Sequence, residues 1–115
     1  TTESATATED EPEMTVSQRN ALRAAENYLS FTAFSRKGLI EQLSSDAGDG
    51  YSVKDATYAV DHVDADWKEQ AAKAAKNYLE MMPFSRDGLI DQLTSDAGDG
   101  YTRAEAEYGV KKAGL

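Results

Sequence analysis

The chain has 115 residues, of which 21 are acidic and 12 are basic, so its formal net charge at pH 7 is −9. It contains no cysteine and one histidine, His62, which excludes disulfides, thiolate metal sites and cysteine nucleophiles within it and leaves little for histidine chemistry. Its negative charge disfavours nucleic acids and anionic membranes as partners and favours basic proteins or cations.

The first fourteen residues, TTESATATEDEPEM, form an acidic segment with five acidic residues, no basic residue and only Met14 as a large apolar one. Such a segment buries too little apolar surface to offset the entropy of ordering it. Residues 1–14 are therefore predicted to be a disordered acidic spacer. Because the chain begins with Thr inside this segment, we expect a mature or trimmed chain whose targeting segment is missing.

The rest of the chain is a tandem repeat. Residues 21–65 align with residues 71–115 at an offset of fifty, with roughly half of the positions identical. The longest shared stretches are Phe34-Ser35-Arg36 with Phe84-Ser85-Arg86, Gly38-Leu39-Ile40 with Gly88-Leu89-Ile90, and Ser45 to Tyr51 with Ser95 to Tyr101. A fixed period of this kind indicates two copies of one supersecondary unit.

Each copy is predicted to contain three short helices, because apolar residues recur at helical spacing and no stretch alternates as a strand does. The predicted starts are Thr15 with Gln18 for a helix over residues 16–31, Ser35 for one ending near residue 45, Ser52 with Asp55 for the third helix, and Thr102 with Glu105 for the third helix of the second copy. The sequence thus predicts an all-α fold of two helix-turn-helix-like repeats over residues 15–64 and 65–115.

The junction between the copies has three residues, 64–66, between Val63 and Trp67, so the copies are predicted to pack together. Trp67 aligns with Ser17 in the first copy, and its indole is therefore specific to the junction. We predict that Trp67 lies at the interface between the repeats, with a ligand-stacking role as the alternative. Gly38 and Gly88, inside the second helices, are predicted to mark a close helix crossing.

The acidic, glycine-rich segments at residues 46–50 and 96–100 raise the question of calcium binding, since carboxylates on such a loop suit a hard cation. The EF-hand pattern fails, because taking Gly50 as its sixth position puts Ala47 third and Ala56 twelfth. The favoured interpretation is a turn in which glycine adopts a positive φ and aspartate bonds local backbone. No metal or cofactor is therefore predicted, although a cation at these turns remains an alternative.

The pattern A-x-x-Y-L-x-x-x-x-F-S-R-x-G-L-I-x-Q-L, followed by the acidic turn, an aromatic residue and A-x-Y-x-V, resembles the Ltp-type host cell surface-exposed lipoprotein family. It begins at Ala25 and recurs in the second copy, and the likeness covers roughly residues 20–113. The resemblance implies a secreted lipoprotein, tethered to the outer face of the bacterial membrane by a lipidated cysteine and a polar spacer. That cysteine is not in this sequence, and the acidic segment fits the spacer that would follow it.

The resemblance further implies superinfection exclusion, in which a prophage-encoded surface protein blocks DNA injection by binding a basic segment of a phage protein, the tape-measure protein. The alternatives are a chromosomal envelope lipoprotein with another partner and, from a different class, an intracellular helix-turn-helix protein that binds nucleic acid. The third helices carry no basic stripe, which disfavours nucleic acid.

No nucleotide-binding, metalloprotease or serine-hydrolase motif occurs, so no catalytic residue is assigned and the protein is predicted not to be an enzyme. Acidic side chains on exposed helix faces are the predicted contacts to a basic partner, with opposite charge raising the rate of association. These candidate partner-binding residues are Glu41, Asp55, Asp91, Glu105 and Glu107.

Overall fold

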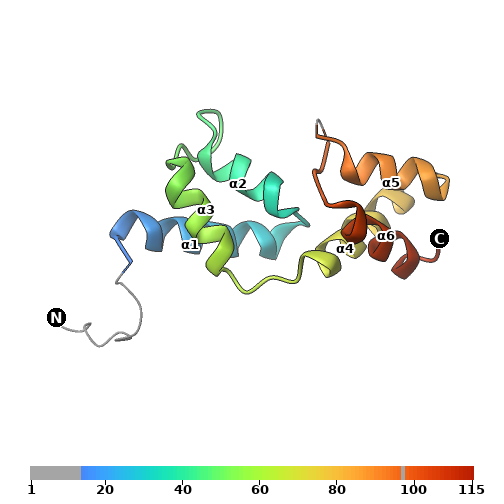
Figure 1. The fold of residues 1–115 in the computed structure, drawn as a ribbon, viewed down its shortest axis with the longest axis horizontal. Helices are drawn as coiled ribbons and strands as arrows, with labels where there is room; N and C mark the ends of the chain where they lie inside the picture. Colours follow the sequence, from blue (N-terminus) through green and yellow to red (C-terminus); the bar gives the residue numbers. More distant parts are fainter. Residues whose placement is uncertain (1–13, 97) are drawn as a thin grey trace.

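The computed structural model describes residues 14–96 and 98–115, and those residues form six helices and no strand (Figure 1). The helices are α1 (Val16–Phe31), α2 (Arg36–Ser44), α3 (Val53–His62), α4 (Trp67–Met81), α5 (Arg86–Thr94) and α6 (Arg103–Lys112). We call α1–α3 repeat 1 and α4–α6 repeat 2. The predicted all-α class is confirmed. The predicted acidic spacer lies, except for Met14, outside the described residues.

Side-chain caps fix where the helices begin. The Thr15 hydroxyl accepts a hydrogen bond from the Gln18 backbone N–H, and the Gln18 side-chain oxygen accepts one from the Thr15 backbone N–H, which is the predicted capping box of α1. The same reciprocal pair joins Thr102 and Glu105 at α6. Asp66 caps α4 and was not anticipated. A cap of this kind contributes about 1 kcal/mol to helix stability, so these residues help to define where each helix begins.

Each repeat has a buried core of its own. Helix-to-helix packing runs mainly within the repeats, with α3 against α1 and α2, and α6 against α4 and α5. The buried cluster of repeat 1 consists of Ala21, Ala25, Leu39, Leu43, Ala56, Ala59 and Val60. That of repeat 2 consists of Ala71, Ala74, Ala75, Leu89, Ile90, Leu93, Tyr101, Ala106 and Val110. The many alanines allow helix axes to approach closely, and each small core supports one three-helix unit.

Helices α4 and α6 approach each other closely at Gly109 of α6. A Cβ atom there would lie 2.7 Å from the carbonyl carbon of Ala71 on α4. The crossing predicted at Gly38 and Gly88 is wrong, because the atom nearest to their Cβ positions is the hydroxyl of their own N-cap, Ser35 or Ser85, at 3.0 and 2.9 Å. Both glycines occupy the first helical turn, where the cap hydroxyl accepts from their backbone N–H.

Among the described residues, no helix combines the length and the apolar character needed to cross a membrane. Residues 63–66 connect the two repeats, which lie side by side in Figure 1. The turns that follow α2 and α5 project toward the same side of the molecule (Figure 1).

Candidate functional site

Two identical turns dominate one side of the molecule. We call Ser45–Tyr51 turn 1 and Ser95–Tyr101 turn 2; Ala97 is outside the described residues. Gly50 and Gly100 have a φ of 74°, a conformation that side chains disfavour, which confirms the predicted glycine turn. The backbone N–H of Gly50 donates to the Ser45 carbonyl at 3.0 Å and that of Tyr51 to the Leu43 carbonyl at 2.8 Å. The same bonds recur in turn 2.

A tyrosine on the first helix of each repeat holds the turn in place. The Tyr28 hydroxyl donates to the Asp49 carboxylate at 2.8 Å, and the Gln42 side chain donates to the Tyr28 oxygen at 3.3 Å. The equivalent residues of repeat 2 are Tyr78, Asp99 and Gln92, with distances of 3.1 and 3.3 Å. Asp49 therefore bonds a distant helix rather than local backbone. The hydrogen bond to Asp49 raises the pKa of Tyr28, while burial is the main cause that raises the pKa of Tyr78.

Among residues 14–96 and 98–115, no group of three or more His, Asp or Glu side chains is placed to hold one ion. In both turns the second aspartate is engaged by a tyrosine hydroxyl instead.

Turn 2 is also where repeat 1 touches repeat 2. The Ser35 hydroxyl donates to the Asp99 backbone carbonyl, and Ser35 is 2% exposed. The Lys37 ammonium lies 2.8 Å from the Asp96 carboxylate. A further hydrogen bond joins repeat 1 to α4: the Phe34 backbone N–H donates to the Gln70 side chain at 3.3 Å. The start of α2 therefore contacts turn 2 through the Ser35 hydroxyl and the Lys37 ammonium group.

These contacts lower the pKa of Asp96 and raise the pKa values of Lys37 and Asp99. The Lys37 hydrogen bond lowers the pKa of Asp96, and the same bond raises the pKa of Lys37, so both groups are held in their charged forms. Burial raises the pKa of the Asp99 carboxyl, although the hydrogen bond from Tyr78 partly opposes that shift. The contact between the repeats therefore combines an exposed ion pair with a half-buried carboxyl.

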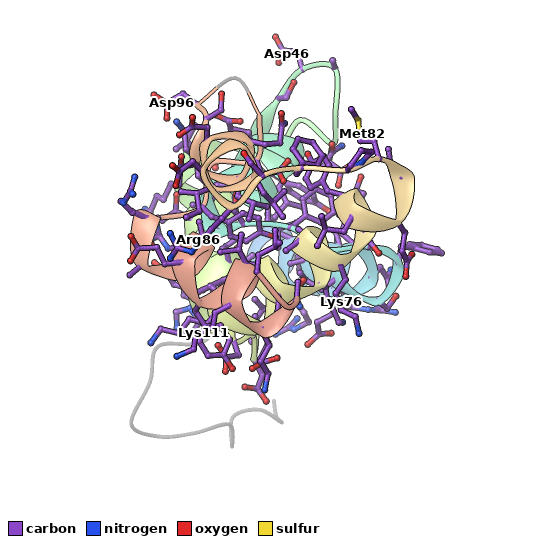
Figure 2. All side chains as sticks on the ribbon, turned by 90° about the vertical axis from the view of Figure 1, so that its right-hand side faces the viewer. Asp46, Lys76, Met82, Arg86, Asp96 and Lys111 are labelled. Carbon is purple, nitrogen blue, oxygen red and sulfur yellow. The ribbon has the colours of Figure 1, made fainter. Side chains whose placement is uncertain are left out.

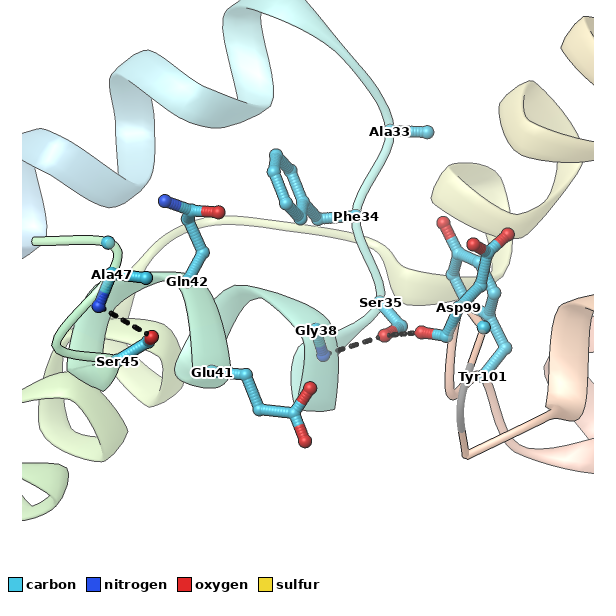
Figure 3. A pocket seen from close by; sticks show the side chains of 12 residues that line it. Ala33, Phe34, Ser35, Gly38, Glu41, Gln42, Ser45, Ala47, Asp99 and Tyr101 are labelled. Carbon is cyan, nitrogen blue, oxygen red and sulfur yellow. Dashed lines mark hydrogen bonds between the residues drawn. The ribbon is translucent and has the colours of Figure 1, made fainter.

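A groove of about 410 Å³ runs along α2 between the two turns (Figure 3). Its floor is the α2 face that presents Gly38, Glu41 and Gln42, which follow one another at helical spacing, together with the C-cap residue Ser45. Residues of turn 1 and turn 2 form its two ends. The side view places Asp46 and Asp96 at the turn tips on one side of the molecule, and Lys76 and Lys111 on the other (Figure 2). The grooved side is consequently the acidic one at these positions.

The five predicted partner-binding residues are distributed over four helices. Glu41 is the one that lines this groove. Asp91 is its counterpart on α5 and is exposed. The other three carboxylates already have partners: Asp55 accepts from the Ser17 hydroxyl, Glu105 belongs to the α6 capping box, and Glu107 lies 2.9 Å from Arg103. Partner binding by all five remains a prediction, with Glu41 the best placed.

Sequence reasoning missed Lys37 and Asp96, because their importance comes from an ion pair that joins residues 59 positions apart. One signal was present in the sequence. Position 37 is Lys in the first copy, and its counterpart, position 87, is Asp, so the copies differ in charge beside an otherwise shared Phe-Ser-Arg motif.

Trp67 is the first residue of α4, is half-buried, and packs against the buried cluster of repeat 1. We predict that Trp67→Ala lowers the stability of repeat 1 by about 1–3 kcal/mol, less than for a fully buried tryptophan. Urea unfolding followed by far-UV circular dichroism measures the loss. Trp67→Phe, which keeps an aromatic ring at the junction, should lose less; equal losses in the two variants would argue against packing by the ring.

The chain matches the model of the host cell surface-exposed lipoprotein family twice, over residues 17–63 and 66–112. A search of curated proteins finds no match. Among solved structures, the chain is similar to that of Ltp, described as a superinfection exclusion protein from the Streptococcus thermophilus temperate phage TP-J34. The TM-score is 0.77 at 34% identity, covering 90% of this chain and 99% of the other. With both repeats matched, the chain belongs to the host cell surface-exposed lipoprotein family.

Proposed function

We propose that this protein acts in superinfection exclusion at the outer face of the cell, blocking phage DNA injection by binding a phage protein. The observation that carries the proposal is the likeness to the phage TP-J34 protein, which extends over 99% of that chain at 34% identity. The mode of action is recognition rather than catalysis. A lipid anchor on the precursor, upstream of the acidic segment, would hold the two repeats at the membrane.

The groove along α2 offers the best surface for such a partner. It lies between turn 1, whose tip carries Asp46, and turn 2, whose Asp96 is paired with Lys37, and Glu41 adds a carboxylate to its floor. Opposite charge speeds encounter and selects partners more than it adds affinity. A basic segment of an injected phage protein, such as the tape-measure protein, is the partner with matching chemistry.

The test is a paired infection assay. The precursor with its signal sequence is expressed in a phage-sensitive relative of its source, and plaques and phage adsorption are counted together. We expect fewer plaques with normal adsorption, because the block follows attachment. Reduced adsorption would instead indicate masking of a receptor. Unchanged plaques across a broad phage panel would overturn the proposal and favour an envelope lipoprotein with a host partner.

Single neutralising variants in the same assay rank the predicted contacts. Glu41→Gln should restore more plaques than Asp55→Asn, Asp91→Asn, Glu105→Gln or Glu107→Gln, since Glu41 is the one in the groove. Glu80→Gln, an exposed change at the end of α4, serves as the matched control and should leave exclusion intact. Equal effects of all six variants would argue against the groove as the contact surface.

A further inference from the structure

The two turns share one sequence but not one environment. Asp99 and Gly100 of turn 2 are half-buried under repeat 1, whereas Asp49 and Gly50 of turn 1 are exposed. A Cβ atom at Gly100 would lie 3.2 Å from Lys37, while one at Gly50 would meet nothing within 4 Å. Within the described residues the Asp46 carboxylate accepts no hydrogen bond, whereas its counterpart Asp96 binds Lys37. Among residues 14–96 and 98–115, turn 2 is the one copy of this surface that another part of the chain covers.

The covered copy shows which groups turn 2 contacts within the chain. Turn 2 receives the start of a helix through two groups: a serine hydroxyl bonded to the backbone carbonyl of Asp99, and a lysine two residues later paired with Asp96. Turn 1 has the matching carbonyl and carboxylate at Asp49 and Asp46. Its backbone has the same glycine φ, and the equivalent tyrosine holds it in place.

We propose that turn 1 is a docking site for the start of a helix in the partner protein, with a hydroxyl side chain followed two residues later by lysine. The proposal rests on the proposed function in taking that partner to be a phage protein. It narrows the partner's chemistry from a basic segment to a serine-x-lysine or threonine-x-lysine helix start. The lysine would pair with Asp46, and the hydroxyl would donate to the Asp49 carbonyl.

A second copy of this chain is a poor occupant of turn 1. The matching helix start is that of α5, where Ser85 is exposed and could donate in the same way. Asp87, however, stands where α2 has Lys37. Docking α5 of one copy on turn 1 of another would place Asp87 against Asp46, and like charges in contact repel. This charge difference opposes head-to-tail chains of copies and leaves turn 1 for a foreign segment.

The same charge difference supplies the probe. Asp87→Lys gives α5 the Ser-Arg-Lys start of α2 on an intact protein. Nuclear magnetic resonance follows the backbone amides of residues 45–51 in ¹⁵N-labelled wild type as unlabelled Asp87→Lys protein is added. Titration should reach about 1 mM, because a short connection in the chain gives the natural contact an effective concentration of that order. We expect progressive shifts confined to turn 1, and binding about tenfold weaker for unlabelled wild type.

A charge swap provides the control. Labelled Asp46→Lys protein should lose its response to the Asp87→Lys probe and gain one to unlabelled wild type, whose Asp87 then faces a lysine. Both changes are at exposed positions, and unchanged core signals verify the fold. If turn 1 shifts in no pairing at about 1 mM, or shifts equally whatever the charges, the docking site is wrong. Plaque reduction by the wild type is scored separately, so a failed titration with intact exclusion overturns only this site.

Discussion

Leu93→Ala is expected to lower the stability of repeat 2 by about 2–5 kcal/mol while leaving repeat 1 folded. Leu93 is 0% exposed and belongs to the repeat 2 cluster, which shares no buried residue with that of repeat 1. Truncation removes apolar contacts and leaves a cavity that surrounding side chains fill only in part. A three-helix unit of about fifty residues has little stability to spare, so repeat 2 of the variant should unfold early.

Two probes of urea unfolding distinguish the repeats. The sole tryptophan, Trp67, packs on the repeat 1 core and reports on it by fluorescence, whereas far-UV circular dichroism reports on all helices. In Leu93→Ala, the dichroism should change at lower urea than the fluorescence. The matched variant Leu43→Ala, in the repeat 1 core, should move the fluorescence transition to lower urea instead. Coincident transitions in both variants would mean that the repeats unfold as one unit.

Gly109→Ala should destabilise the protein by about 1–3 kcal/mol, the usual cost of forcing extra atoms into a packed contact. The added methyl group would lie 2.7 and 2.8 Å from the carbonyl carbon and oxygen of Ala71. Backbone atoms cannot rotate away as a flexible side chain can, so α4 and α6 must separate.

The direction in which Gly109→Ala changes the stability distinguishes a close contact from an open position. Without a close contact, alanine in place of a helical glycine stabilises by about 0.5–1 kcal/mol. The urea midpoint of Gly109→Ala should therefore fall, and a rise would contradict the close approach. Ala59→Gly is the matched change at the equivalent, buried position of repeat 1, and it should destabilise for the opposite reason, lost packing and lower helix propensity.

Local features were predictable from the sequence because local chemistry determines them. Capping pairs such as Thr15 with Gln18, and the glycine turn at Gly50, depend on residues three to eight positions apart. Because the sequence repeats, local patterns such as the glycine turn occur twice in the chain. The close approach at Gly109 was not predictable in this way, since its cause is the backbone of α4 nearly forty positions earlier. The helix crossing predicted at Gly38 was wrong because the nearest neighbour of this glycine is local: it is the hydroxyl of its own N-cap, Ser35, rather than another helix.

The candidate site was likewise predictable only in part. Glu41 was chosen as an acidic residue on an exposed helix face, and it does line the groove. Asp55, Glu105 and Glu107 satisfied the same criterion, yet their carboxylates are engaged by Ser17, Thr102 and Arg103. Charge pattern alone cannot separate a paired carboxylate from an unpaired one. The groove itself depends on how one repeat sits against the other, through contacts that join residues about sixty positions apart.

The hydrogen bonds from Tyr28 to Asp49 and from Tyr78 to Asp99 have a consequence for a protein exposed to the growth medium. The pKa values of Tyr28 and Tyr78 both lie above the ordinary 10.0, so their hydroxyl groups keep their protons in acidic and mildly alkaline surroundings alike. The Gln42 and Gln92 amides, which donate to the hydroxyl oxygens of these two tyrosines, do not ionise. When the medium becomes acidic, the donors that fix the two turns therefore stay unchanged. A change at the Tyr78 hydrogen bond in acid must instead come from its acceptor, the Asp99 carboxyl, whose pKa burial raises.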